Sequence, residues 1–120
     1  MSDSSHLAVE SPPTPEKRQR EKLSGQKPKT QPPYAVVVFN DDEHTFPYVV
    51  ETFMKVFGYP LEKSHTLAEQ IHNEGRGIVW SGAREVAELK RDQIRSAGPD
   101  FYAEKKVGFP LGVTIEPLPG

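Results

Sequence analysis

The stretch that decides the fold is Tyr34–Asp42, YAVVVFNDD, in which an apolar run is followed at once by an asparagine and two aspartates. A strand that is almost continuously apolar needs burial on both faces, so we expect residues 34–39 to form a central strand. The three acceptor-rich side chains after it are then placed at the rim of the core. Such a group can bind a cation, or it can form a turn and a helix cap.

The chain beyond this strand is predicted to form three helices and two more strands. Thr45 and Ser81 are suitable N-caps for the first and third helices, and Gly58 and Gly75 occupy the usual glycine positions at helix ends. The order β-α-α-β-α-β packs most simply as an α+β sandwich, with a three-stranded antiparallel sheet and three helices on one face. The expected elements are strand 34–39, helix 46–57, a helix from Pro60 to Gly75, strand 77–81, helix 82–97, a short extended piece at 101–102 within the loop 99–110, and strand 111–116.

Composition divides the chain into a tail and one domain. Residues 1–33 hold six of the twelve prolines and none of the aromatic residues, so they cannot bury enough surface to offset the entropy of ordering them. We therefore expect a disordered N-terminal extension over residues 1–33 and a single core domain over residues 34–120. The extension has a net charge of +2 and the core one of −4, which argues against nucleic acid as a partner and favours cationic ligands.

The cellular setting is predicted from what the sequence omits. There is no cysteine, which fits a reducing compartment, and the N-terminus has neither a basic nor an apolar signal region. No run approaches the roughly 20 apolar residues of a membrane span. We expect a soluble, cytoplasmic and monomeric protein that needs no membrane.

Catalysis and metal binding are two possible functions of the polar residues, and the sequence favours neither. Ser81 and the histidines do not form a recognisable nucleophile motif, and no phosphate loop or dinucleotide fingerprint is present. His65 and His72 lie two helical turns apart, roughly 10 Å along the axis, which is too far for joint metal ligation without a third element. We therefore predict no enzyme activity, no catalytic residues, no metal and no cofactor.

A third possibility is recognition of an ammonium group beside an apolar pocket. A free α-amino group has a pKa of about 7.7 to 8.0 and presents three donors at neutral pH. Asn40, a carboxylate of Asp41 or Asp42, and a neutral His72 nitrogen would supply three acceptors. His72 on pattern alone is equally compatible with a partly buried helix residue, so the residues by themselves leave this choice open.

Four short motifs in order closely resemble the ClpS family, the adaptors of the bacterial Clp protease. They are VFNDD at residues 38–42, YVV at 48–50, IHNEGRG at 71–77 and EVAE-x-K at 85–90, and the similarity covers about residues 34–118. The resemblance implies a non-enzymatic adaptor that binds N-degron peptides and proteins by a bulky apolar first residue. It would deliver them to the N-terminal domain of a Clp-family AAA+ unfoldase.

The resemblance also implies roles for individual residues. The α-amino group would be held by Asn40, Asp41, Asp42 and His72, with Asp41 as the more direct partner of the ammonium and Asp42 as the supporting charge. The family's pocket positions are filled here by His44, Phe46, Val49, Ala68, Ile71 and Leu111. Contact with the unfoldase would come from Glu85 and Lys90. The alternative is a ClpS-like interaction domain that binds other cargo without amine recognition.

Overall fold

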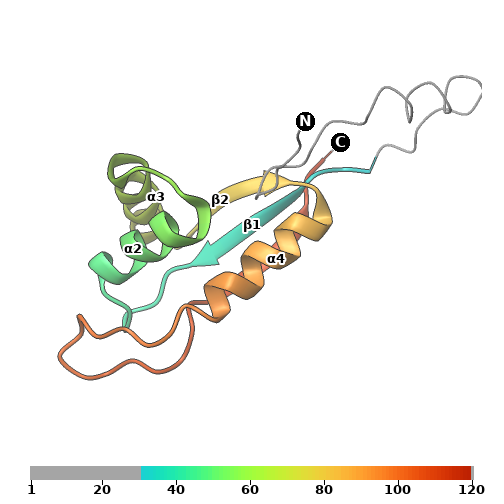
Figure 1. The fold of residues 1–120 in the computed structure, drawn as a ribbon. Helices are drawn as coiled ribbons and strands as arrows, with labels where there is room; N and C mark the ends of the chain where they lie inside the picture. The colour runs from blue at the N-terminus through green and yellow to red at the C-terminus, as the bar shows by residue number, and fades with distance from the viewer. Residues whose placement is uncertain (1–30, 120) are drawn as a thin grey trace, which may run out of the picture.

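The computed structural model describes residues 31–119, and these form three helices beside a three-stranded antiparallel sheet (Figure 1). β1 is the central strand of the order β2-β1-β3, so the predicted α+β fold is confirmed. The elements are β1 (Tyr34–Phe39), α2 (Phe46–Phe57), α3 (Leu61–Glu74), β2 (Arg76–Gly82), α4 (Arg84–Arg95) and β3 (Val113–Pro117). The disorder expected for the N-terminal extension falls, for residues 1–30, outside the described residues.

One hydrophobic core joins the sheet to all three helices. Val36 and Val38 point to the same face of β1 because side chains alternate along a strand, and both are fully buried. Phe53 of α2, Ile71 of α3 and Ile94 of α4 belong to the same cluster. The three helices therefore cover one face of the sheet. Ala35 and Val37, which alternate with those two valines, are also buried but lie outside this cluster.

The start and end of α2 agree with the signals predicted from the sequence. The Thr45 side chain accepts a hydrogen bond from the backbone N–H of Tyr48 at 3.3 Å, and Pro47 sits in the first turn. Gly58 ends the helix in the left-handed region at φ 70°, where its N–H donates to the Met54 carbonyl. These contacts satisfy backbone groups that a helix end leaves without partners.

The prediction that Ser81 caps the third helix was wrong. Ser81 and Gly82 remain in β2, where they pair with Ala35 and Tyr34, so α4 begins at Arg84 and Ala83 is its N-cap residue. A Cβ at Gly82 would lie 2.4 Å from the Trp80 ring, which means that a side chain there would displace the indole. Strand pairing thus extends β2 beyond its predicted end at residue 81.

Other predicted boundaries shift by up to two residues. α4 ends at Arg95, and Ser96 is its C-cap residue. β3 begins two residues later than predicted, at Val113, which pairs with Val38. The extended piece expected at residues 101–102 is not observed, because the bridge in this loop joins Asp100 to Val107. Figure 1 shows the loop reaching back toward the start of α2.

Candidate functional site

The end of β1 lies against the end of α3 because α3 runs directly into β2. Gly75 ends α3 at φ 89°, and the next residue, Arg76, is the β2 partner of Phe39. The backbone N–H of Asn40 donates to the Gly75 carbonyl at 2.8 Å. His72 is in the last turn of α3, so the polar residues after β1 and this histidine share one rim.

All ten residues predicted for the amine site and the pocket line a single cavity of about 400 Å³. This volume lies within the usual range for small-molecule sites, about 300 to 1,000 Å³. The lining residues are Val38, Phe39, Asn40, Asp41, Asp42, His44, Phe46, Val49, Ala68, Ile71, His72 and Leu111. The predicted residues are therefore brought together, while what they bind stays a prediction.

The cavity has an apolar floor and a polar rim. Ala68, Ile71 and Leu111 are each 3% exposed, and the first two lie three residues apart on one face of α3. Asn40 and His72 are exposed at the mouth. Within residues 31–119, neither of their side chains makes a hydrogen bond to another part of the protein, so their polar atoms are available to a ligand.

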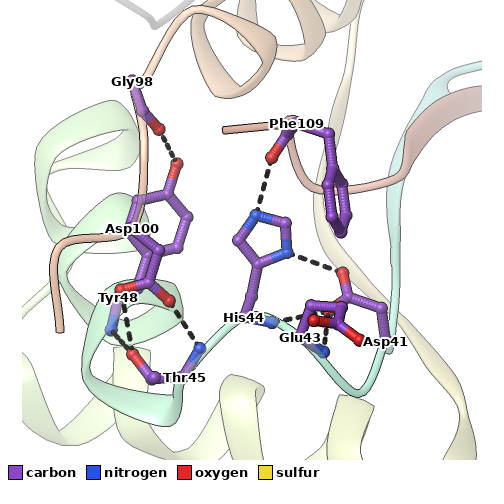
Figure 2. A network of polar contacts seen from close by, with 8 residues as sticks. All are labelled: Asp41, Glu43, His44, Thr45, Tyr48, Gly98, Asp100 and Phe109. Carbon is purple, nitrogen blue, oxygen red and sulfur yellow. Dashed lines mark hydrogen bonds and ion pairs between the residues drawn. The ribbon is translucent and has the colours of Figure 1, made fainter. Parts of the chain in front are cut away.

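The Asp41 carboxylate organises the turn after β1 (Figure 2). Its Oδ1 accepts the backbone N–H groups of Glu43 at 2.8 Å and of His44 at 2.7 Å, and its Oδ2 lies 2.7 Å from the His44 Nδ1. Burial acts to raise the pKa of Asp41, but hydrogen bonds from the His44 backbone and ring and from the Glu43 backbone outweigh it and hold the pKa below its ordinary value. A carboxylate offers about four acceptor positions, so about one remains free.

His44 lies between this turn and the loop before β3. Its side chain is 1% exposed, and its Nε2 is 2.9 Å from the carbonyl oxygen of Phe109 (Figure 2). The ring stacks on Tyr48 with centroids 5.1 Å apart and meets the Phe109 ring edge-on at 4.9 Å. His44 lines the cavity as predicted, but its link to residue 109 was not foreseen.

Asp100 anchors the other end of the same loop, and no sequence pattern identified it. It is fully buried, its Oδ2 accepts the Thr45 N–H at 2.6 Å, and its Oδ1 accepts the Thr45 hydroxyl at 3.2 Å and the Tyr102 N–H at 2.9 Å. The Tyr48 hydroxyl donates to the Gly98 carbonyl at 2.5 Å (Figure 2). The loop and the N-terminus of α2 are therefore joined by several hydrogen bonds.

The two residues predicted to contact an unfoldase lie on α4, which contributes no residue to the cavity lining. Glu85 is exposed, whereas Lys90 is 5% exposed and its Nζ donates to the Val56 carbonyl at 2.7 Å. The Lys90 ammonium also lies 5.7 Å from the centre of the Phe57 ring. Burial lowers the pKa of Lys90. Lys90 thus joins α4 to the end of α2.

Residues 31–119 hold neither a preformed metal cluster nor a membrane-spanning helix. No group of three or more His, Cys, Asp or Glu side chains in this part of the chain is arranged to hold a metal ion. No helix among these residues is long and apolar enough to cross a membrane.

Comparison with known proteins points to one family. The family model described as "ATP-dependent Clp protease adaptor protein ClpS" matches residues 29–114. The chain is 38% identical to the ClpS adapter protein of Desulforapulum autotrophicum, covering 85% of this chain and 93% of that protein. It is 45% identical to the one from Nostoc sp., covering 58% and 73%. The solved structure of Agrobacterium tumefaciens ClpS2 bound to L-phenylalaninamide is similar with a TM-score of 0.60 and 26% identity, over 74% of this chain and 100% of that one.

Proposed function

The chain belongs to the ClpS family of ATP-dependent Clp protease adaptors, and from this premise we propose that it is an N-degron receptor. It binds the free α-amino group and the bulky apolar first side chain of a substrate and delivers that substrate to a Clp-family AAA+ unfoldase. Members of this family are adaptors and not enzymes. The observation that carries the proposal is the cavity, which combines an apolar floor with free acceptors at its mouth.

The rim has the acceptors that an ammonium group requires. At neutral pH a free α-amino group is mostly charged and offers three N–H donors. Asn40 Oδ1, the remaining acceptor position of Asp41 and an unprotonated His72 nitrogen supply three acceptors. The exposed Asp42 carboxylate adds negative charge at the same rim, which favours a cation over a neutral amide.

The floor suits the first side chain. Val49, Ile71 and Leu111 present carbon atoms to a cavity large enough for a leucine or an aromatic group. Burying such a side chain contributes about 1.5 to 3 kcal/mol, and hydrogen bonds to charged groups contribute about 1.5 to 3 each. After the cost of association we expect a Kd in the micromolar range, as suits a carrier that must release its cargo.

The similar ClpS2 structure supports this assignment through the chemistry of its ligand. That protein is bound to L-phenylalaninamide, a molecule with a free α-amino group and a benzyl side chain. The ligand therefore carries the two groups for which the present cavity has complementary surfaces. By the same proposal, residues 34–120 form the adaptor domain, and the exposed Glu85 contacts the N-terminal domain of the unfoldase. The buried Lys90 supports that surface by fixing α4.

The proposal is tested by comparing a Leu-initiated peptide with its N-acetylated form. Acetylation removes the charge and two of the three donors and leaves the leucine side chain unchanged, so we expect micromolar binding of the free amine and loss of at least about tenfold on acetylation. Equal binding of the two peptides would contradict amine recognition. It would instead favour a ClpS-like domain that takes other cargo.

A further inference from the structure

We propose that His44 is a positioning residue whose charged imidazolium ring links the Asp41 carboxylate to the Phe109 carbonyl, so that the amine site and one wall of the pocket are held together. This inference rests on the proposed function, since it concerns how the same cavity is kept ready for a first residue. It adds a role for the loop 99–110.

The protonation state of the ring is determined by its two partners. Nδ1 lies 2.7 Å from a carboxylate oxygen and Nε2 lies 2.9 Å from a backbone carbonyl oxygen, and neither oxygen can donate a proton. A neutral imidazole has only one N–H, so it would turn a bare nitrogen toward one of these acceptors. The side chain is 1% exposed, which leaves little room for water to replace the missing donor. Only the doubly protonated ring satisfies both contacts.

The link to Phe109 bears on the pocket because Leu111, which lines the cavity, is only two residues further along the chain. On the other side of Leu111, the Gly112 carbonyl accepts the Phe39 N–H at 2.9 Å. The segment that carries Leu111 is therefore held at one end by the last residue of β1 and at the other by His44.

The groups around the ring determine what happens when it loses a proton. Asp41 faces it from the turn and Tyr48 from α2, and burial raises the pKa of Tyr48, which stays neutral. From the loop, the ring meets the Phe109 carbonyl and phenyl group, which do not titrate. Asp100 is bonded one residue further on, to Thr45. The remaining proton would stay on Nδ1, because a hydrogen bond to a carboxylate is stronger than one to a neutral carbonyl. Loss of charge therefore releases the loop first.

The direct test is the 15N signature of the His44 ring in the full wild-type chain, measured across pH. We expect both ring nitrogens to carry a proton when both contacts are made, and amide exchange near Gly108, corrected for its intrinsic pH dependence, to be slow as long as they do. A bare ring nitrogen in the folded chain, or corrected exchange that does not change with the ring, would overturn the proposal. This measurement needs no variant and so does not depend on whether one folds.

The functional test compares His44→Gln with the control Lys55→Gln, which likewise replaces a basic side chain, at an exposed position that does not line the cavity. For a Phe-initiated peptide we expect His44→Gln to bind about tenfold more weakly than wild type, and the control to bind within about twofold of wild type.

The outcomes separate this inference from the proposed function. If wild type does not discriminate the free from the acetylated peptide, amine recognition itself is wrong. If it does discriminate and His44→Gln binds as tightly as wild type, amine recognition stands and the role of His44 is refuted. A loss in His44→Gln while the 15N signature of the wild-type ring shows a bare nitrogen would mean that the imidazole only fills space, and would refute it as well.

Discussion

Replacing Asp100 by alanine should weaken the fold more than any other change of a single polar side chain in the loop 99–110. Its carboxylate is fully buried and accepts two hydrogen bonds from Thr45 and one from the N–H of Tyr102. Alanine removes all three acceptor contacts and replaces them with nothing. The exposed Tyr102 segment can turn its N–H to water, whereas the Thr45 N–H lies at the partly buried start of α2.

The expected cost is set by these contacts. A buried donor left without a partner costs about 1 to 3 kcal/mol, and each lost hydrogen bond to a charged acceptor about 1.5 to 3. Removing a buried carboxylate recovers part of its desolvation, so we expect a net loss of about 2 to 3 kcal/mol in the free energy of unfolding. That is a large share of the roughly 5 to 15 kcal/mol typical of a domain. Asp100→Asn keeps one acceptor oxygen but turns its NH2 group toward a backbone N–H in either orientation, so it should lose about 1 to 3 kcal/mol.

Urea unfolding measures the effect, with an unchanged m-value as the check that both variants unfold alike. Asp92→Ala is the matched control, because its side chain is 61% exposed on α4 and a surface change of this kind usually stays within about 0.5 kcal/mol. If Asp100→Ala costs no more than the control, the hydrogen bonds between the loop and α2 contribute nothing to stability and our account of this network is wrong.

Three further variants test other parts of the structure. Ala68→Met extends a side chain from a 3% exposed position into the cavity. In a fluorescence anisotropy assay it should weaken the binding of Trp- and Phe-initiated peptides more than that of Leu-initiated ones. Equal weakening would argue against a pocket for the first side chain. Lys90→Ala should lower the free energy of unfolding by about 2 kcal/mol. Lys90→Met should lower it by less than half of that, because methionine keeps the packing of the side-chain stem and removes a charge that burial disfavours. Similar losses in the two variants would contradict a packing role for the stem. The folded-state pKa of Asp41 lies below the unfolded value of about 3.9, so the carboxylate contributes its full stabilisation above that value and loses it as the pH falls through the folded-state pKa. The difference in free energy of unfolding between wild type and Asp41→Asn, measured in urea, should therefore vanish at the acid end. A difference that persists there would exclude this origin.

The elements with strong local signals could be predicted to the residue. The bounds of β1 and α2 agree with the prediction because an apolar run, an N-cap threonine and a terminal glycine act within a few residues of one another. The start of α4 could not be predicted in this way. Ser81 has the chemistry of a cap, but its pairing with Ala35 is a contact between distant segments, and it keeps the residue in β2.

In the candidate site, too, some features could be predicted from the sequence, whereas contacts between distant segments could not. The ten residues around the cavity were named from the resemblance to ClpS, and the structure places all ten around one cavity. The hydrogen bonds between Asp100 and Thr45 were not predicted, because the two residues are 55 positions apart and neither segment has a local pattern that indicates the contact. A single buried aspartate in a loop has no sequence pattern of its own.

The cavity is assembled from segments far apart in the chain: the end of β1, the first turns of α2, the last turns of α3 and Leu111. A ligand of this cavity can therefore bind only when all these segments are in place, and by mass action it stabilises the folded chain as a whole. At a free peptide concentration of about 100 times Kd the gain is about 2.7 kcal/mol. Under the proposed function, cargo therefore stabilises the folded form of its own carrier, and a partly unfolded adaptor binds no cargo.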